Sequence, residues 1–246
     1  MRKKVFYYLA LIISLSIISS GCGKAEEPKG KGPSAKIAVK KETATTQAEP
    51  QATPKTPAQE KDTAADAERE PITEEMVLFS FEKDEDGWEV PEWALDKDDH
   101  VAESIEISSD VASEGNSSLK VNSNFPGRIW SAAIIEHEQY FDFSPYREIA
   151  VDVYITEDTP LGLRAKIILT VGDSWKWTEM TRSVPLIPGE WVTIRGDIGP
   201  GSYDWKRVLP DETFRQDIRK IVVRVESNKR PVYKGPVYID NLRIGK

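Results

Sequence analysis

Short runs in which apolar and polar residues alternate dominate the chain from about residue 76 onward. At residues 149–155 the odd-numbered positions are all Ile or Val, whereas Asp152 and Tyr154 fall between them. This period of two is typical of a strand with one buried face. Loop-forming breaks separate the runs and no long helical pattern occurs, so we expect an all-β sandwich. The predicted strands are residues 76–81, 104–107, 118–121, 129–135, 149–155, 165–171, 175–181, 191–194, 220–225 and 237–244, with a helical turn plausible at 210–219.

The first residues have the order of a secretory signal: a basic cap, an apolar run at 5–18 and small residues before Cys22. The run is shorter than the ~20 residues that span a bilayer core, which disfavours a membrane-spanning anchor. Gly21-Cys22 resembles the end of a bacterial lipoprotein signal, although Ser19 stands where that family usually has Leu. The resemblance implies a signal peptide at 1–21 and a Cys22 that carries acyl chains such as palmitate. It also implies a lipid-anchored protein of the cell envelope, at the outer membrane or cell surface.

Residues 22–75 have a different composition, rich in Lys, Glu, Ala, Thr and Pro, with no aromatic residue. Such a segment cannot bury enough apolar surface to offset its conformational entropy, so we expect a disordered tether. A stalk that contacts peptidoglycan or carries glycans at Thr43, Thr45 and Thr46 is the alternative. The remaining residues, 76–246, are enough for one domain with its own core.

Charge and cysteine content narrow the possible functions. The formal net charge is −8, and it becomes −11 if the signal peptide with its three cations is removed. Nucleic acids and anionic lipid headgroups are therefore unfavourable partners. One Cys and two His, His100 and His137, exclude an intramolecular disulfide and leave little material for a zinc site or a Cys/His catalytic pair.

Several short motifs in the last segment carry a family resemblance: Phe79-Ser-Phe-Glu82 with Gly87-Trp88, and the segments 114–121, 141–146, 188–191 and 237–243. In chain order, they resemble those of bacterial carbohydrate-binding modules, the galactose-binding-domain-like jelly rolls that accompany glycoside hydrolases. The resemblance implies a β-sandwich jelly roll over residues 76–246 that binds polysaccharide. A sandwich that contacts another protein and binds no sugar remains the alternative, because one fold serves many functions.

Sugar binding needs flat aromatic faces and fixed polar groups, and one predicted strand offers both. Its alternation puts Trp175, Trp177 and Glu179 on one face, with the two indoles ~7 Å apart along the strand. The alternative is that one or both indoles pack in the core. If three further strands join this one in a single sheet, its outer face forms the preferred ligand surface. Those strands contribute Arg128, Trp130, Arg164, Lys166, Arg224 and Glu226.

The other Trp residues divide into two groups. Trp88 and Trp191 belong to the motifs of the resemblance, and we expect both in the core. Trp93 and Trp205 lie in irregular segments, where each either plugs an end of the sandwich or lines the mouth of a cleft.

The resemblance also implies a structural Ca²⁺, since many such modules hold one through hard oxygen ligands. Carried over by motif, the ligands are the side chains of Glu82 and Asp240 with carbonyls around Glu114 to Asn116. The alternative is that Glu82 and Asp240 cap strand ends or join surface ion pairs.

An enzyme would have to use a carboxylate pair, such as Glu136 with Glu138 or Asp152 with Glu179. Nothing in the sequence singles out either pair, and neither His has a motif partner. We therefore expect a non-catalytic protein.

Overall fold

The computed structural model describes residues 71–246. The predicted signal peptide, Cys22 and all but the end of the predicted tether lie outside the described residues. Among the described residues, the first strand begins at Glu75, one residue before the predicted domain boundary. Within residues 71–246, no helix has the length and apolarity needed to cross a membrane.

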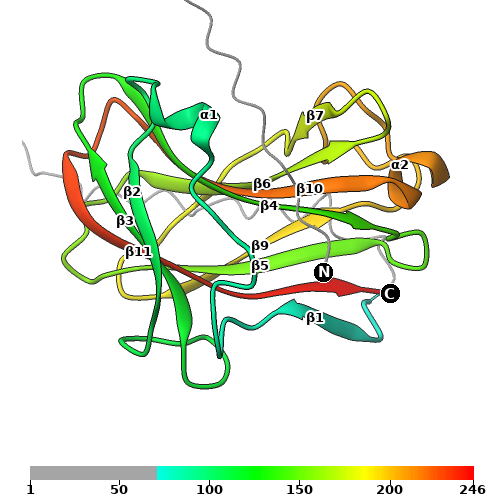
Figure 1. Ribbon diagram of the computed structural model, residues 1–246, viewed down its shortest axis with the longest axis horizontal. Coiled ribbons are helices and arrows are strands. Elements are labelled where there is room, and N and C mark those ends of the chain that lie inside the picture. The colour runs from blue at the N-terminus through cyan, green and yellow to red at the C-terminus, as the bar shows by residue number, and fades with distance from the viewer. Residues whose placement is uncertain (1–70) are drawn as a thin grey trace, which may run out of the picture. The chain divides into compact units, whose positions relative to one another are not determined.

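Two antiparallel sheets form the domain, lying over one another in Figure 1. The six-stranded sheet has the order β2-β3-β11-β5-β9, with β1 pairing along part of β11. Its strands are β1 (Glu75–Phe79), β2 (Ala102–Ser108), β3 (Ser118–Phe125), β5 (Glu148–Ile155), β9 (Trp191–Asp197) and β11 (Tyr233–Gly245). The five-stranded sheet has the order β4-β10-β6-β7, with β8 also on β6. Its strands are β4 (Trp130–Phe141), β6 (Leu163–Val171), β7 (Lys176–Glu179), β8 (Val184–Pro185) and β10 (Ile218–Asn228).

The core lies between the sheets and is filled by one row of side chains from each strand. In β10, Ile221, Val223 and Val225 point inward, whereas the residues between them point outward. Trp88 packs in this core against Phe79 and Phe81, as expected from the sequence. The alternation of apolar and polar residues therefore decides the face of each residue, and the all-β sandwich is confirmed.

The core prediction for Trp191 is wrong. Its neighbour Val192 and the buried Ile194 face the core, so Trp191 faces outward from the six-stranded sheet. There its ring lies 5.4 Å from that of Tyr154, its partner on β5. The motif suggested a buried indole, but the strand's period of two places it on the outer face.

Each predicted strand is present, and two short elements were missed. They are β8 and the helix α1 (Glu92–Leu95), neither of which is long enough to show a period. The helix α2 (Glu212–Gln216) forms within the predicted helical turn. It begins at Asp211, whose side chain accepts a hydrogen bond from the Phe214 N–H at 2.7 Å.

The segment that carries α1 runs along the free edge of the five-stranded sheet. Its first end is fixed by two hydrogen bonds of 2.9 Å between the backbones of Glu89 and Glu136 on β4. At its other end, Val101 N–H donates to the Ala132 carbonyl, and Ala132 N–H donates to the Asp99 carbonyl. Between these attachments α1 lies over the outer face of that sheet (Figure 1). The segment therefore forms a wall beside the sheet.

Candidate functional site

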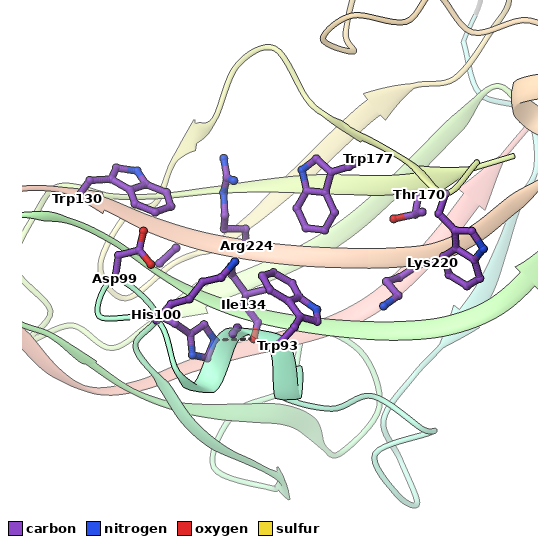
Figure 2. Close-up of a pocket in the computed structure, with 13 residues that line it drawn as sticks. Trp93, Asp99, His100, Trp130, Ile134, Thr170, Trp177, Lys220 and Arg224 are labelled. Atoms are coloured by element: carbon purple, nitrogen blue, oxygen red, sulfur yellow. Dashed lines mark hydrogen bonds between the residues drawn. The ribbon is translucent and has the colours of Figure 1, made fainter. Parts of the chain in front are cut away.

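A hollow of about 500 Å³ lies on the outer face of the five-stranded sheet, bounded on one side by α1. Four indoles line it and remain partly open to solvent: Trp93 is 42% exposed, Trp130 38%, Trp175 46% and Trp177 40%. Figure 2 shows Trp130, Arg224 and Trp177 following one another along this groove, with Trp93 opposite them. Thr170 and Lys220 lie toward the far end. The groove therefore combines several aromatic faces with polar side chains.

Strand register explains why residues far apart in sequence meet here. Lys220 on β10 pairs with Thr170 on β6, which pairs with Trp177 on β7. All three belong to outward rows, so their side chains share the groove. A small apolar cluster on the same face supports it, formed by Ala132, Ile134, Ile168 and Val222. The four strands expected to share one sheet, β4, β6, β7 and β10, do so.

Trp175 reaches the groove by a different route. It stands in the turn before β7 with φ of 52°, in the left-handed region, and its N–H donates to the Gly172 carbonyl at 2.9 Å. Arg219 lies 5.8 Å from its ring. The extended alternation that predicted a shared face with Trp177 therefore does not describe Trp175, although its indole does line the groove.

Trp93 supplies the opposite wall. It comes from α1, and its ring lies 5.9 Å from that of Trp177 at an interplanar angle of 90°. Its Nε1–H donates to Glu136 Oε2 at 3.1 Å, and Lys97 Nζ lies 4.2 Å from the centre of its ring. Two positions for Trp93 were compatible with the sequence, at an end of the sandwich or at the mouth of a cleft. The structure shows that Trp93 forms the wall of the groove. Trp205 is the plug: it is buried beside Phe214.

A dense charge network lies beside the groove. Arg224 bonds Glu179 Oε2 at 2.5 Å and Glu226 Oε2 at 2.9 Å. Burial alone would raise the pKa of Glu179, but the bond from Lys206 and the charges of Arg224 and Lys166 outweigh burial and lower that pKa. Burial lowers the pKa of the Lys166 ammonium. The charges of this network therefore largely compensate one another, and Lys97, a further cation in the groove lining, lies over the Trp93 ring.

The candidate sugar-binding residues therefore occupy three kinds of position. Trp130, Trp175, Trp177 and Arg224 line the groove. Glu179 and Glu226 hold Arg224 through ion pairs. Arg128 lies outside the groove lining, exposed in the turn before β4 with φ of 67°, where its N–H donates to the Lys229 carbonyl. The turn ends the alternation that was expected to bring Arg128 beside Trp130.

Three of the proposed calcium ligands, Glu82, Glu114 and Asp240, line a second hollow of about 550 Å³ together with Asn241, whereas Asn116 is outside its lining. Glu82 accepts hydrogen bonds from the backbone N–H groups of Asn116 and Ser117, which lower its pKa. Gly115 has φ of 70°, in the left-handed region that favours glycine, and a Cβ there would lie 2.2 Å from Glu82 Oε1 and displace that carboxylate.

The fit of Ca²⁺ to this hollow depends on neutral oxygens as well as carboxylates. Among residues 71–246, no three His, Cys, Asp or Glu side chains gather closely enough to hold an ion. However, Asn241 Oδ1 is buried without a hydrogen-bond partner. Burial and the nearby Asp152 raise the pKa of Asp240, although backbone N–H groups oppose this. An unpartnered buried oxygen beside two carboxylates suits a hard cation.

Neither carboxylate pair considered for catalysis has the arrangement of an acid and a nucleophile. Glu136 and Glu138 both bind Lys220, at 2.6 and 3.3 Å. Asp152 lies on the six-stranded sheet and pairs with Arg243, whereas Glu179 lies on the other sheet. Asp152 and Glu179 therefore cannot face a common substrate.

Comparison with known proteins gives a family match over most of the domain. The family described as "Mannanase, galactose-binding domain-like" matches residues 79–241. No curated protein matches the chain.

Solved structures of carbohydrate-binding modules share the fold. A module of family CBM28, described as specific for non-crystalline cellulose, is 12% identical with a TM-score of 0.50, over 71% of this chain and 96% of that one. CBM27-1 of Caldicellulosiruptor saccharolyticus, solved with mannohexaose, is 22% identical with a TM-score of 0.49, over 70% and 97%. TmCBM27, described as recognising mannan, is 19% identical with a TM-score of 0.44, over 72% and 97%. At these identities the likeness concerns the fold.

Proposed function

Since the chain belongs to the family of galactose-binding-like domains of mannanases, we propose that its groove binds a neutral β-linked polysaccharide, of the mannan or glucan class. The protein holds this polysaccharide without cleaving it. The observation that carries the proposal is the gathering of four partly exposed indoles in one groove with polar side chains between them. Pyranose rings have apolar faces that stack on indoles, and hydroxyls that need fixed hydrogen-bond partners.

The charge pattern supports a neutral ligand. Arg224 is paired with two carboxylates, and Lys220 is paired with Glu136 and Glu138. A polyuronate would have to compete with these carboxylates for the cations. Paired ions can instead direct their remaining donors and acceptors toward hydroxyls, which carry no charge.

The ring geometry favours a single polysaccharide chain as the ligand rather than the flat surface of a crystalline polysaccharide. Trp93 and Trp177 stand at 90° to each other, so they cannot both lie flat on one plane. A single chain can contact one indole with a ring face and the other from its side. We therefore expect soluble polysaccharide to bind more tightly than crystalline material.

The envelope location rests on the resemblance of residues 1–22 to a lipoprotein signal. A lipidated Cys22 followed by the tether would keep the groove accessible near the membrane surface, with the polysaccharide as the partner of the folded domain. Calcium in the second hollow would stabilise the loop around Gly115 and would take no part in sugar contact, because that loop is not part of the groove lining.

The test is a binding screen of the chain from residue 22 onward, with Cys22→Ser to prevent lipidation. Mannans, β-glucans, xylan and a polyuronate are compared by affinity electrophoresis, with calcium and with chelator. Retention by a neutral β-linked polysaccharide, and its loss in the Trp175→Ala/Trp177→Ala double variant, is the expected result. Failure of the folded protein to bind every polysaccharide would refute the proposal and favour a protein-contact sandwich. A double variant that binds like the parent would refute the site.

A further inference from the structure

Glu136 is an acidic residue buried beneath the wall of the groove. It stands in the outward row of β4 and is 3% exposed. Its Oε1 accepts a hydrogen bond from Lys220 Nζ at 2.6 Å, and its Oε2 accepts one from Trp93 Nε1 at 3.1 Å. A buried carboxylate is unfavourable unless it is paired and hydrogen-bonded, and both oxygens of Glu136 are used.

We propose that Glu136 is a positioning residue, whose carboxylate fixes the indole of Trp93 across the groove from Trp177 and thereby shapes the groove for one polysaccharide chain. This inference rests on the proposed function and adds a residue that does not itself line the groove. Lys220 completes the arrangement, because its ammonium holds the Glu136 carboxylate in place.

The side chain of Glu136 carries this role, since the backbone contacts are too distant. The paired backbones of Glu89 and Glu136 fix the start of the wall, but Trp93 stands four residues further along. The helix that carries Trp93 has four residues and no side-chain hydrogen bond at its N-cap, Pro91. Such a short helix does not define a side-chain direction by itself. Lys97 and Trp177 also contact the ring of Trp93, but the hydrogen bond to Glu136, 43 positions along the chain, is the contact that holds its Nε1–H.

The substitution Glu136→Gln tests the carboxylate while keeping its size. Gln offers one acceptor oxygen to two donors, and the charged Lys220 makes the stronger hydrogen bond. Trp93 therefore loses its acceptor. Glu138→Gln is the matched control: Glu138 lies two residues along β4, binds the same Lys220 at 3.3 Å and is exposed. It removes the same charge without touching the bond to Trp93.

The binding experiment uses the chain from residue 22 onward with Cys22→Ser, and mannohexaose as the probe in titration calorimetry. We expect Glu136→Gln to weaken binding by up to about tenfold, because Trp93 then spends less time in the binding-competent orientation that this hydrogen bond favours, and Glu138→Gln to leave affinity nearly unchanged. Trp93→Phe removes the donor and keeps a ring. In that background Glu136→Gln should cause no further loss, because both changes delete one interaction. Fully additive losses would overturn the proposal.

A second measurement needs no ligand and separates the two proposals. In ¹⁵N-labelled protein, the indole N–H signal of Trp93, assigned through Trp93→Phe, should shift and exchange faster with solvent in Glu136→Gln but not in Glu138→Gln. An unmoved signal would overturn the positioning role whatever the protein binds. A parent that binds no polysaccharide, with the signal moved as expected, would refute the proposed function and leave the positioning of Trp93 by Glu136 standing. If Glu136→Gln fails to fold, Trp93→Phe must still weaken mannohexaose binding, and parent-like affinity would overturn the proposal.

Discussion

Replacing Trp177 by Ala should remove a large and calculable part of the binding energy. Trp177 keeps 40% of its surface exposed in the groove. For a side chain of roughly 250 Å², that leaves about 100 Å² for a ligand to cover. At about 25 cal/mol per Å², full coverage stabilises the complex by about 2.5 kcal/mol and half coverage by about 1.2 kcal/mol. Since about 1.4 kcal/mol is tenfold in affinity, Trp177→Ala should weaken binding between about eightfold and about sixtyfold.

Titration calorimetry with a soluble manno-oligosaccharide measures this loss, and thermal unfolding checks that the variant folds. The matched control is Trp191→Ala, which deletes an indole from the outer face of the other sheet, where it packs on Tyr154. Trp191→Ala should leave affinity unchanged. A Trp177→Ala protein that binds as tightly as the parent, or an equal loss in Trp191→Ala, would refute the assignment of the groove.

Three further predictions concern metal, acid and anchoring. With free calcium at a hundred times its dissociation constant, calcium binding stabilises the folded state by roughly 2.7 kcal/mol, so a chelator should lower the unfolding temperature of the parent. Asp240→Asn should abolish that difference. A parent whose unfolding temperature does not respond to the chelator has no such site. Burial lowers the pKa of His100, so its neutral form stabilises the fold above its unfolded-state pKa of about 6.5, and that stability is lost as the pH falls through the lower folded-state value. His100→Asn should therefore lose less stability than the parent between neutral pH and pH 5 in urea unfolding, whereas an identical loss would contradict this account. Cys22→Ser should move the protein from the membrane fraction to the soluble fraction of cells, and a variant that stays in the membrane fraction would exclude a lipid anchor at Cys22.

The fold was predictable because its strands alternate regularly between core and surface. Residues 149–155 and 221–225 show the alternation directly, and both are central strands of the structure. The same rule would have placed Trp191 correctly, because Val192 and the buried Ile194 mark the core face of β9. The error came from giving a motif more weight than the period of the strand.

The groove was predictable only in part, for two physical reasons. Trp130 and Trp177 lie on regular strands, so their shared face follows from parity once the strands join one sheet. Trp93 stands on a four-residue helix that no periodic pattern reveals. Its neighbours in the groove come from β4 and β7, and a contact over such a distance in sequence depends on tertiary packing, which local patterns do not encode.

The contrast between the two outer faces of the sandwich supports the assignment of the groove. On the six-stranded sheet, Tyr154 contacts both Trp191 and Tyr238, so these rings cover part of one another. In the groove over the five-stranded sheet, four indoles keep about two fifths of their surface open. The charges beside them, Arg224, Glu179 and Glu226, are half-buried in ion pairs, which stabilise a fold little compared with apolar packing. Folding alone accounts for neither the open indoles nor these half-buried ion pairs, but a ligand that stacks on indoles and needs fixed polar partners accounts for both.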